Sequence, residues 1–166
     1  MGGTASTAFP TGNINMATTS NGYLSDYLQW GTLLAQAMQQ ECDVYISAQA
    51  MMDTTTRQAE ITTTAYADSE KDYQLLIWLT EDSIVGAQAM PDGSVNTHYY
   101  HQHVLRAASE NTWGANWLLN TTPTQRTYTL AIPDKCKIEH CHIITLLLNK
   151  ETKEILNATK TRLTPK

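Results

Sequence analysis

Apolar residues recur along this chain with two different periods, and the change of period divides it into a helical part and a β-rich part. Between residues 24 and 40 the spacing is three and four, which predicts one helix whose apolar stripe packs on a sheet. That stripe comprises Leu24, Tyr27, Leu28, Gly31, Leu34, Ala35 and Met38. From Asp43 onward the period is two, which is typical of strands that bury one face.

Eight segments after residue 43 carry the strand pattern and are separated by turns. They span residues 44–52, 58–67, 73–80, 83–90, 99–107, 126–132, 141–148 and 153–162. Segment 73–80 is almost continuously apolar, which predicts a central strand buried on both faces, whereas 115–124 is expected to be a loop. The spacing of about ten residues indicates a mainly β fold: an immunoglobulin-like antiparallel β-sandwich of seven to eight strands with one N-terminal helix.

The first 22 residues have a different composition, rich in Gly, Thr, Ala, Ser and Asn. They are expected to form a loose arm, residues 1–22, ahead of one domain that contains the helix and the sandwich, residues 23–166. No window reaches 18 apolar residues, so no membrane-spanning helix is predicted.

Charge and composition narrow the classes of partner. Charged residues make up 16% of the 166 residues and the formal net charge is -5, so nucleic acid is not an expected partner. Eight tyrosines and four tryptophans supply the large aromatic area, because Phe occurs once. A polar but weakly charged surface favours an extracellular or envelope protein.

Specific side chains are concentrated in one stretch, HYYHQHVLRAASENTWG, residues 98–114. Exposed aromatic residues there would form a platform for a sugar or a protein loop. The candidate binding residues are Tyr99, Tyr100, His101, His103, Arg106, Trp113 and Trp117. The alternative is that these aromatic residues belong to the core, and for Trp113, as a plug at the end of the sandwich, that alternative is favoured.

The histidines of this stretch raise a second possibility. On a continuous strand His101 and His103 share a face, and with His98 they are candidate metal ligands to which Asp92 or Glu81 would add an oxygen. That arrangement would support a metal-dependent hydrolase. A polar strand face explains the same residues, no nucleophile lies in an elbow motif, and the sequence is read as a non-enzyme without a cofactor.

Three cysteines complete the candidate chemistry. Cys136 and Cys141 bracket a short loop ahead of an apolar strand, and in an oxidising compartment they are candidates for a disulfide. Zinc is an alternative with His140 and His142 nearby, but neighbouring residues of a strand face opposite sides. Cys42, between the helix and the first strand, is expected to be a buried apolar residue.

Three stretches together resemble a known family: YQLLIWLTEDSIVGAQ, YYHQHVLRAASENTWG and CHIITLLLNKETKEILNA. They are similar to the C-terminal half of the twenty-eight-kilodalton outer-membrane protein family of Bacteroidetes, found in Porphyromonas and Bacteroides. The shared features are a Leu-Thr-Glu-Asp strand end, a Tyr-x-His-x-His-Val-Leu-Arg segment, a Trp-Gly pair and a final hairpin with Thr-Lys-Glu. The matching segments here are 79–82, 99–106, 113–114 and 149–156.

The resemblance implies a surface protein of the outer membrane, held by a lipid anchor outside these residues. It implies an adhesion or receptor role toward a host protein or glycan, and no catalytic residues. Its members carry a thioredoxin-like domain before an immunoglobulin-like domain, so the arm would be the remnant of that upstream domain. A second role, as a spacer that orients the thioredoxin-like domain, follows from the same arrangement.

Overall fold

The computed structural model describes residues 11–18, 25–109 and 113–166. Near the N-terminus are the short strands β1 (Thr11–Gly12) and β2 (Ser25–Asp26), the 3₁₀ turn Tyr27–Gln29 and the helix α1 (Trp30–Ala37). The remaining strands are β3 (Val44–Asp53), β4 (Gln58–Ala67), β5 (Lys71–Glu81), β6 (Ile84–Ala89), β7 (Val95–His101), β8 (Val104–Ala108), β9 (Ala115–Leu119), β10 (Thr124–Ala131), β11 (Cys141–Asn149) and β12 (Ile155–Pro165).

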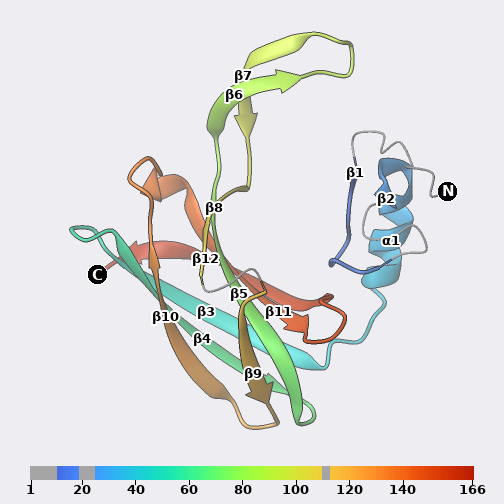
Figure 1. The fold of residues 1–166 in the computed structure, drawn as a ribbon, viewed down its shortest axis with the longest axis vertical. Helices are drawn as coiled ribbons and strands as arrows, with labels where there is room; N and C mark the ends of the chain where they lie inside the picture. The colour runs from blue at the N-terminus through green and yellow to red at the C-terminus, as the bar shows by residue number, and fades with distance from the viewer. Residues whose placement is uncertain (1–10, 19–24, 110–112) are drawn as a thin grey trace, which may run out of the picture.

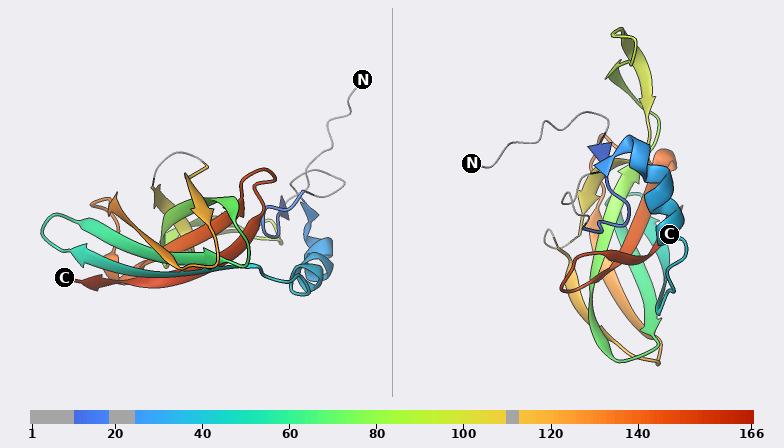
Figure 2. Two further views of the ribbon diagram at one scale, coloured as in Figure 1. Left: turned by 90° about the horizontal axis from the view of Figure 1, so that it is seen from below. Right: turned by 90° about the vertical axis from the view of Figure 1, so that its right-hand side faces the viewer.

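One eight-stranded sheet forms the body of the molecule, in the order β10-β4-β3-β12-β11-β5-β8, with β9 also pairing with β5. Strand β12 joins its two halves, because residues 155–162 pair with β11 and Leu163–Pro165 pair in parallel with β3. The sheet curls so that the two halves face each other as layers (Figure 1, Figure 2). A single twisted sheet thereby encloses a core, as a sandwich does.

The core lies between these layers and is made by the inward residues of each strand. Strands β3, β4, β5, β9, β10 and β11 all contribute to it, and Tyr73, Leu75, Ile77 and Leu79 project from alternate positions of β5. The other face of β5 is covered as well, because Leu76 packs with Leu146 and Leu148 in a second cluster. The predicted burial of β5 on both faces is therefore confirmed.

The mainly β fold, with its layered antiparallel sheet and one N-terminal helix, is confirmed. The immunoglobulin-like connectivity is compatible with this topology and stays a prediction. The parallel contact between β12 and β3 departs from a purely antiparallel pattern. No helix in the described part of the chain is long and apolar enough to cross a membrane.

The strands differ most from the sequence prediction in two places. The segment 99–107, predicted as one strand, is split into β7 and β8 at Gln102 and His103, because His103 adopts a positive φ of 55°. The predicted loop 115–124 contains β9, which pairs with β5 from Lys71 to Leu75. The turn at His103 causes the first difference, and pairing with β5 causes the second. The alternation of apolar and polar residues along the chain indicates neither.

The helix prediction was right in type and wrong in packing. Helix α1 is eight residues long, none of them is buried, and it lies beside one end of the sheet rather than on it (Figure 2). The predicted apolar stripe is largely exposed, with exposed fractions of 75% at Leu28, 50% at Leu34 and 78% at Met38. Leu24 lies outside the described residues.

The described part of the N-terminal arm, residues 11–18, contacts the rest of the chain. Strands β1 and β2 pair across the expected boundary at residue 22. Ile155 donates a hydrogen bond from its backbone N to the carbonyl oxygen of Asn15 at 2.7 Å, and Met16 packs against the second apolar cluster. Whether the arm is the remnant of an upstream domain stays a prediction.

Candidate functional site

The β6–β7 hairpin projects from one end of the curled sheet (Figure 1). Among the described strands these two pair only with each other, from Ile84 opposite His101 to the tip. At the tip Met90 donates from its backbone N to the carbonyl oxygen of Ser94, and Gly93 donates to that of Met90. The hairpin is therefore held together locally and receives no third strand from the described residues, an arrangement of marginal stability on its own.

Aromatic and apolar side chains occupy both faces of this hairpin. Val85 lies opposite Tyr100, and the two are 52% and 61% exposed. On the other face the rings of Tyr99 and His101 meet edge to face with centroids 5.0 Å apart. Gly86 makes room for them, since a Cβ there would come within 3.2 Å of the His101 ring. The result is an exposed aromatic surface on a strand pair.

The hairpin carries almost no charge. Within residues 84–101, Asp92 is the one residue among Asp, Glu, Lys and Arg. Its Oδ1 accepts hydrogen bonds from the Ser94 hydroxyl at 2.7 Å and from the Ser94 amide at 2.9 Å. His98 donates its amide to Asn96 at 2.9 Å. An uncharged surface of aromatic rings, amides and hydroxyls is suited to contacts with protein or sugar rather than with ions.

Asp82 ties the base of the hairpin to the body. Ser83 and His103, where the chain enters and leaves, have positive φ values of 60° and 55°. Asp82 Oδ1 accepts the His103 amide at 2.7 Å and lies 2.9 Å from its Nδ1, while Oδ2 lies 3.5 Å from His142 Nδ1 and 3.8 Å from Lys160 Nζ. One carboxylate therefore connects the hairpin exit with β11 and β12.

The titration of these groups follows from the same contacts. The hydrogen bond from the His103 amide, helped by the charges of His103 and Lys160, holds the pKa of Asp82 below its ordinary value, against a smaller opposing effect of burial. Burial lowers the pKa of His142, and Lys160 adds to this. The contacts at the foot of the hairpin therefore favour an ionised Asp82 and a neutral His142.

A buried polar cluster lies around Glu81, the last residue of β5 and three residues before β6. Glu81 is 3% exposed, and its Oε2 lies 3.4 Å from Arg106 Nε while its Oε1 accepts the Lys137 amide at 2.9 Å. The ligand atoms of Glu81, Cys136 and Cys141 all lie within 4.8 Å of one another. Burial raises the pKa of the Cys141 thiol to about 12 and also raises that of Cys136.

Sequence reasoning missed this cluster, although a signal for it was present. Glu81 continues the inward alternation of Leu75, Ile77 and Leu79 along β5, so its side chain points into the core. The other members come from different segments, and their approach depends on the tertiary structure.

The candidate binding residues do not form one site. Tyr99, Tyr100 and His101 lie together on the hairpin, and His103 lies at its base. Arg106 is directed toward the buried Glu81 instead, with 23% of its side chain exposed. Arg106 therefore forms an ion pair with a buried carboxylate, and its expected place in an open binding surface is wrong.

Trp113 and Trp117 each lie in the kind of environment that was expected for the other. Trp117 is 2% exposed and belongs to the core beneath Arg126, whose guanidinium carbon lies 5.0 Å from the ring centroid. Its place in a binding surface is wrong, because β9 pairs with β5 and turns Trp117 inward. Trp113, expected as a plug, is 42% exposed, with Lys153 Nζ 5.7 Å from its ring centroid.

The three histidines do not converge. His98 lies beside Thr97, His101 against Tyr99, and His103 against Asp82, so each has a different neighbour. Of the described side chains, the group that could hold a metal is Glu81 with the two cysteines, and it contains no histidine. The alternative metal site of His98, His101 and His103 is therefore not assembled in the described structure, because the chain turns between the last two.

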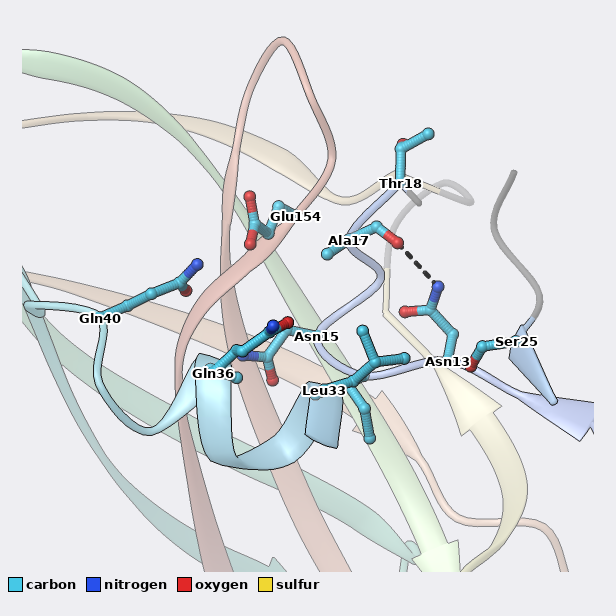
Figure 3. Close-up of a pocket in the computed structure, with 11 residues that line it drawn as sticks. Asn13, Asn15, Ala17, Thr18, Ser25, Leu33, Gln36, Gln40 and Glu154 are labelled. Atoms are coloured by element: carbon cyan, nitrogen blue, oxygen red, sulfur yellow. Dashed lines mark hydrogen bonds between the residues drawn. The ribbon is translucent and has the colours of Figure 1, made fainter. Parts of the chain in front are cut away.

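A cleft of about 290 Å³ lies between α1 and the arm (Figure 3). Leu33 and Gln36 line it from the helix, Asn13 from the arm and Glu154 from the turn before β12. Asn13 donates to the carbonyl oxygen of Ala17 at 2.9 Å. Apolar and amide side chains line it together, and no nucleophile among them lies beside a base, so the cleft presents no catalytic arrangement.

Comparison with known proteins adds a family match. A family model described as outer membrane protein Omp28 matches residues 4–166. A domain of the outer membrane lipoprotein Omp28 from Porphyromonas gingivalis is similar in structure, with TM-score 0.51 and 17% identity, covering 76% of this chain and 93% of that one. No curated protein sequence matches the chain.

Two other solved structures are less similar. The sporulation control protein Spo0M from Bacillus subtilis has TM-score 0.40 and 10% identity, covering 75% of this chain and 50% of its own. A β-glucosidase from Listeria innocua in complex with isofagomine has TM-score 0.33 and 6% identity, covering 74% and 16%. At these scores neither supports a statement about this chain.

Proposed function

This chain belongs to the outer membrane protein Omp28 family, and from that premise we propose that it is a non-catalytic binding module. Family membership makes it a protein of the outer membrane or cell surface. The proposal adds an adhesion or receptor role toward a host protein or glycan, with the β6–β7 hairpin as the contact surface. The observation that carries it is the exposed pair Val85 and Tyr100 on a hairpin that projects from the body.

Physical reasons support the hairpin as the contact element. A monomer ordinarily buries tyrosine rings or scatters them singly, whereas here two adjacent tyrosines lie on an element that covers no core of its own. Tyrosine combines apolar area with a hydroxyl and is enriched where binding energy is concentrated. The unpaired outer edges of β6 and β7 also offer backbone groups to an extended partner segment.

The test is a binding screen with a matched pair of tyrosine variants. The protein is applied to immobilised extracellular-matrix proteins and to a glycan array, and each ligand found is titrated. Tyr100→Ser should weaken binding at least tenfold, since hot-spot aromatic residues contribute about 2 kcal/mol or more. Tyr45→Ser, which removes a 40% exposed tyrosine on β3, should leave binding unchanged. Equal losses in both variants, or no ligand for the wild type, would contradict the proposal.

A second candidate function is supported by the exposed helix. The apolar side chains of Leu28, Leu34 and Met38 lack a covering surface in the described structure. They would be covered if the chain acted as a spacer that orients an upstream thioredoxin-like domain against α1. Hydrogen exchange tests this: amides of α1 should exchange more slowly when a thioredoxin-like domain is fused ahead of these residues than in these residues alone. Equal exchange rates in the two would remove the spacer role.

A further inference from the structure

We infer that Cys136 and Cys141 form a covalent modification site, which becomes a disulfide while the protein folds at the cell envelope. Cys136 lies in the connection between β10 and β11, and Cys141 is the first residue of β11. Both are buried thiols, 5% and 3% exposed, and their sulfur atoms lie within 4.8 Å of each other. The site is independent of the hairpin surface.

The loop that carries Cys136 is anchored on both sides. Arg57 donates to the carbonyl oxygen of Pro133 at 2.8 Å and to that of Cys136 at 3.0 Å. The Lys137 amide donates to Glu81 at 2.9 Å. In the folded chain these bonds keep the two sulfur atoms within 4.8 Å of each other, so the native state favours the bond between them.

The surroundings favour a disulfide over a metal ion. Arg106 Nε lies 3.4 Å from the one carboxylate in the cluster, and its positive charge opposes a divalent cation at the same place. A metal would also need both sulfurs as thiolates, whereas burial raises the pKa of both thiols. An outer-membrane protein matures in an oxidising compartment, where closely placed thiols are converted to disulfides.

The chemistry needs an external disulfide as oxidant. One cysteine thiolate attacks a sulfur of that oxidant, forms a mixed disulfide and releases the first reduced thiol. The second cysteine thiolate attacks the mixed disulfide, closes the bond between Cys136 and Cys141 and releases the second thiol. Two protons and two electrons leave the chain, and the oxidant is reduced to two thiols. Because the folded thiols are buried and protonated, this exchange belongs to an early stage of folding.

The experiment refolds the reduced chain in a mixture of reduced and oxidised glutathione, followed by alkylation under denaturing conditions without reductant. One alkylated thiol, Cys42, should be found instead of three, and a peptide map should show Cys136 linked to Cys141. The bond closes a short loop, so reduction should lower Tm by about 5 °C. Cys42→Ser is the matched control, because it removes the exposed thiol and should keep both the bond and the shift.

Other outcomes would overturn the inference. Three alkylated thiols after refolding, or a bond that involves Cys42, would exclude the proposed pair. Three alkylated thiols in the denatured chain, together with one zinc retained per native chain, would replace the disulfide by a metal site. The peptide map of the wild type decides the matter even if a Cys136→Ser and Cys141→Ser double variant fails to fold.

Discussion

The β6–β7 hairpin and the curled sheet share the same strand geometry and differ in what covers their side chains. In β5 almost every apolar residue is buried, on one face or the other, whereas no residue of β6 or β7 is buried. The sheet is stabilised by packing, while the hairpin depends on its own ladder and on Asp82 at its base. The comparison shows that binding residues can lie on exposed strands, because the side chains of such strands are not needed in the core.

Two glycines give the largest expected contrast between the regions. Gly114 and Gly93 both have positive φ, 75° and 82°, but a Cβ at Gly114 would overlap the carbonyl oxygen of Leu75, whereas the space around Gly93 is open. Gly114→Ala should lower the free energy of unfolding by about 4 kcal/mol or more, and Gly93→Ala should lower it by about 1 kcal/mol. Urea unfolding measures both. Similar costs would mean that the hairpin tip is as constrained as the body.

The buried ion pair should give the next largest effect. Arg106→Met leaves the Glu81 carboxylate buried without its cation, and should lower the free energy of unfolding by about 3 kcal/mol. The matched variant Arg126→Met removes a guanidinium that covers Trp117 and has no acidic partner among the described residues. It should lower the free energy of unfolding by about 1 kcal/mol or less. If the two changes cost the same, Glu81 is not held by Arg106.

Two valines compare the regions by packing alone. Val44 on β3 is fully buried and Val85 on β6 is 52% exposed. Val44→Ala should cost about 2 kcal/mol through lost burial and the cavity left behind. Val85→Ala should stay within about 0.5 kcal/mol. A large cost for Val85→Ala, measured by thermal or urea unfolding, would show that the hairpin packs on something in solution.

Acid should loosen the hairpin at its base. The folded pKa of Asp82 is lowered, so its stabilisation is present above the unfolded value near 4 and is lost as pH falls through the folded pKa. Asp82→Asn should lower the stability of the hairpin by about 1.5 kcal/mol at neutral pH, measured by hydrogen exchange of the β7 amides. In acid the variant and the wild type should exchange alike. Asp92→Asn, at the tip, is the control and should leave exchange of the β7 amides unchanged.

His142 adds a second pH window, at higher pH. Its folded pKa is lowered, so the unfolded chain binds the proton first as pH falls below about 6.5, and stability decreases from there toward the folded pKa. Urea midpoints measured between pH 7 and pH 5 should fall in the wild type. They should fall less in His142→Gln, and an equal fall would assign this pH dependence to another group.

Most of the sheet could be predicted from the chain because alternation is a local property. The two-residue period around Val44 and Ile61 and the continuous apolar run of β5 indicated which faces are buried, and the structure agrees. The candidate site was predicted only in part. Tyr99, Tyr100 and His101 do lie together, whereas Arg106 and Trp117 are directed into the body.

By itself, the sequence determined the strand-forming segments, the mainly β class and the family, since each depends on short patterns of residues. The tertiary structure decided that the chain turns at His103, that α1 lies beside the sheet, and that Glu81, Cys136 and Cys141 meet. The physical reason is that alternation reports which side of a strand a residue occupies. Which surface covers that side depends on contacts between segments far apart in the chain.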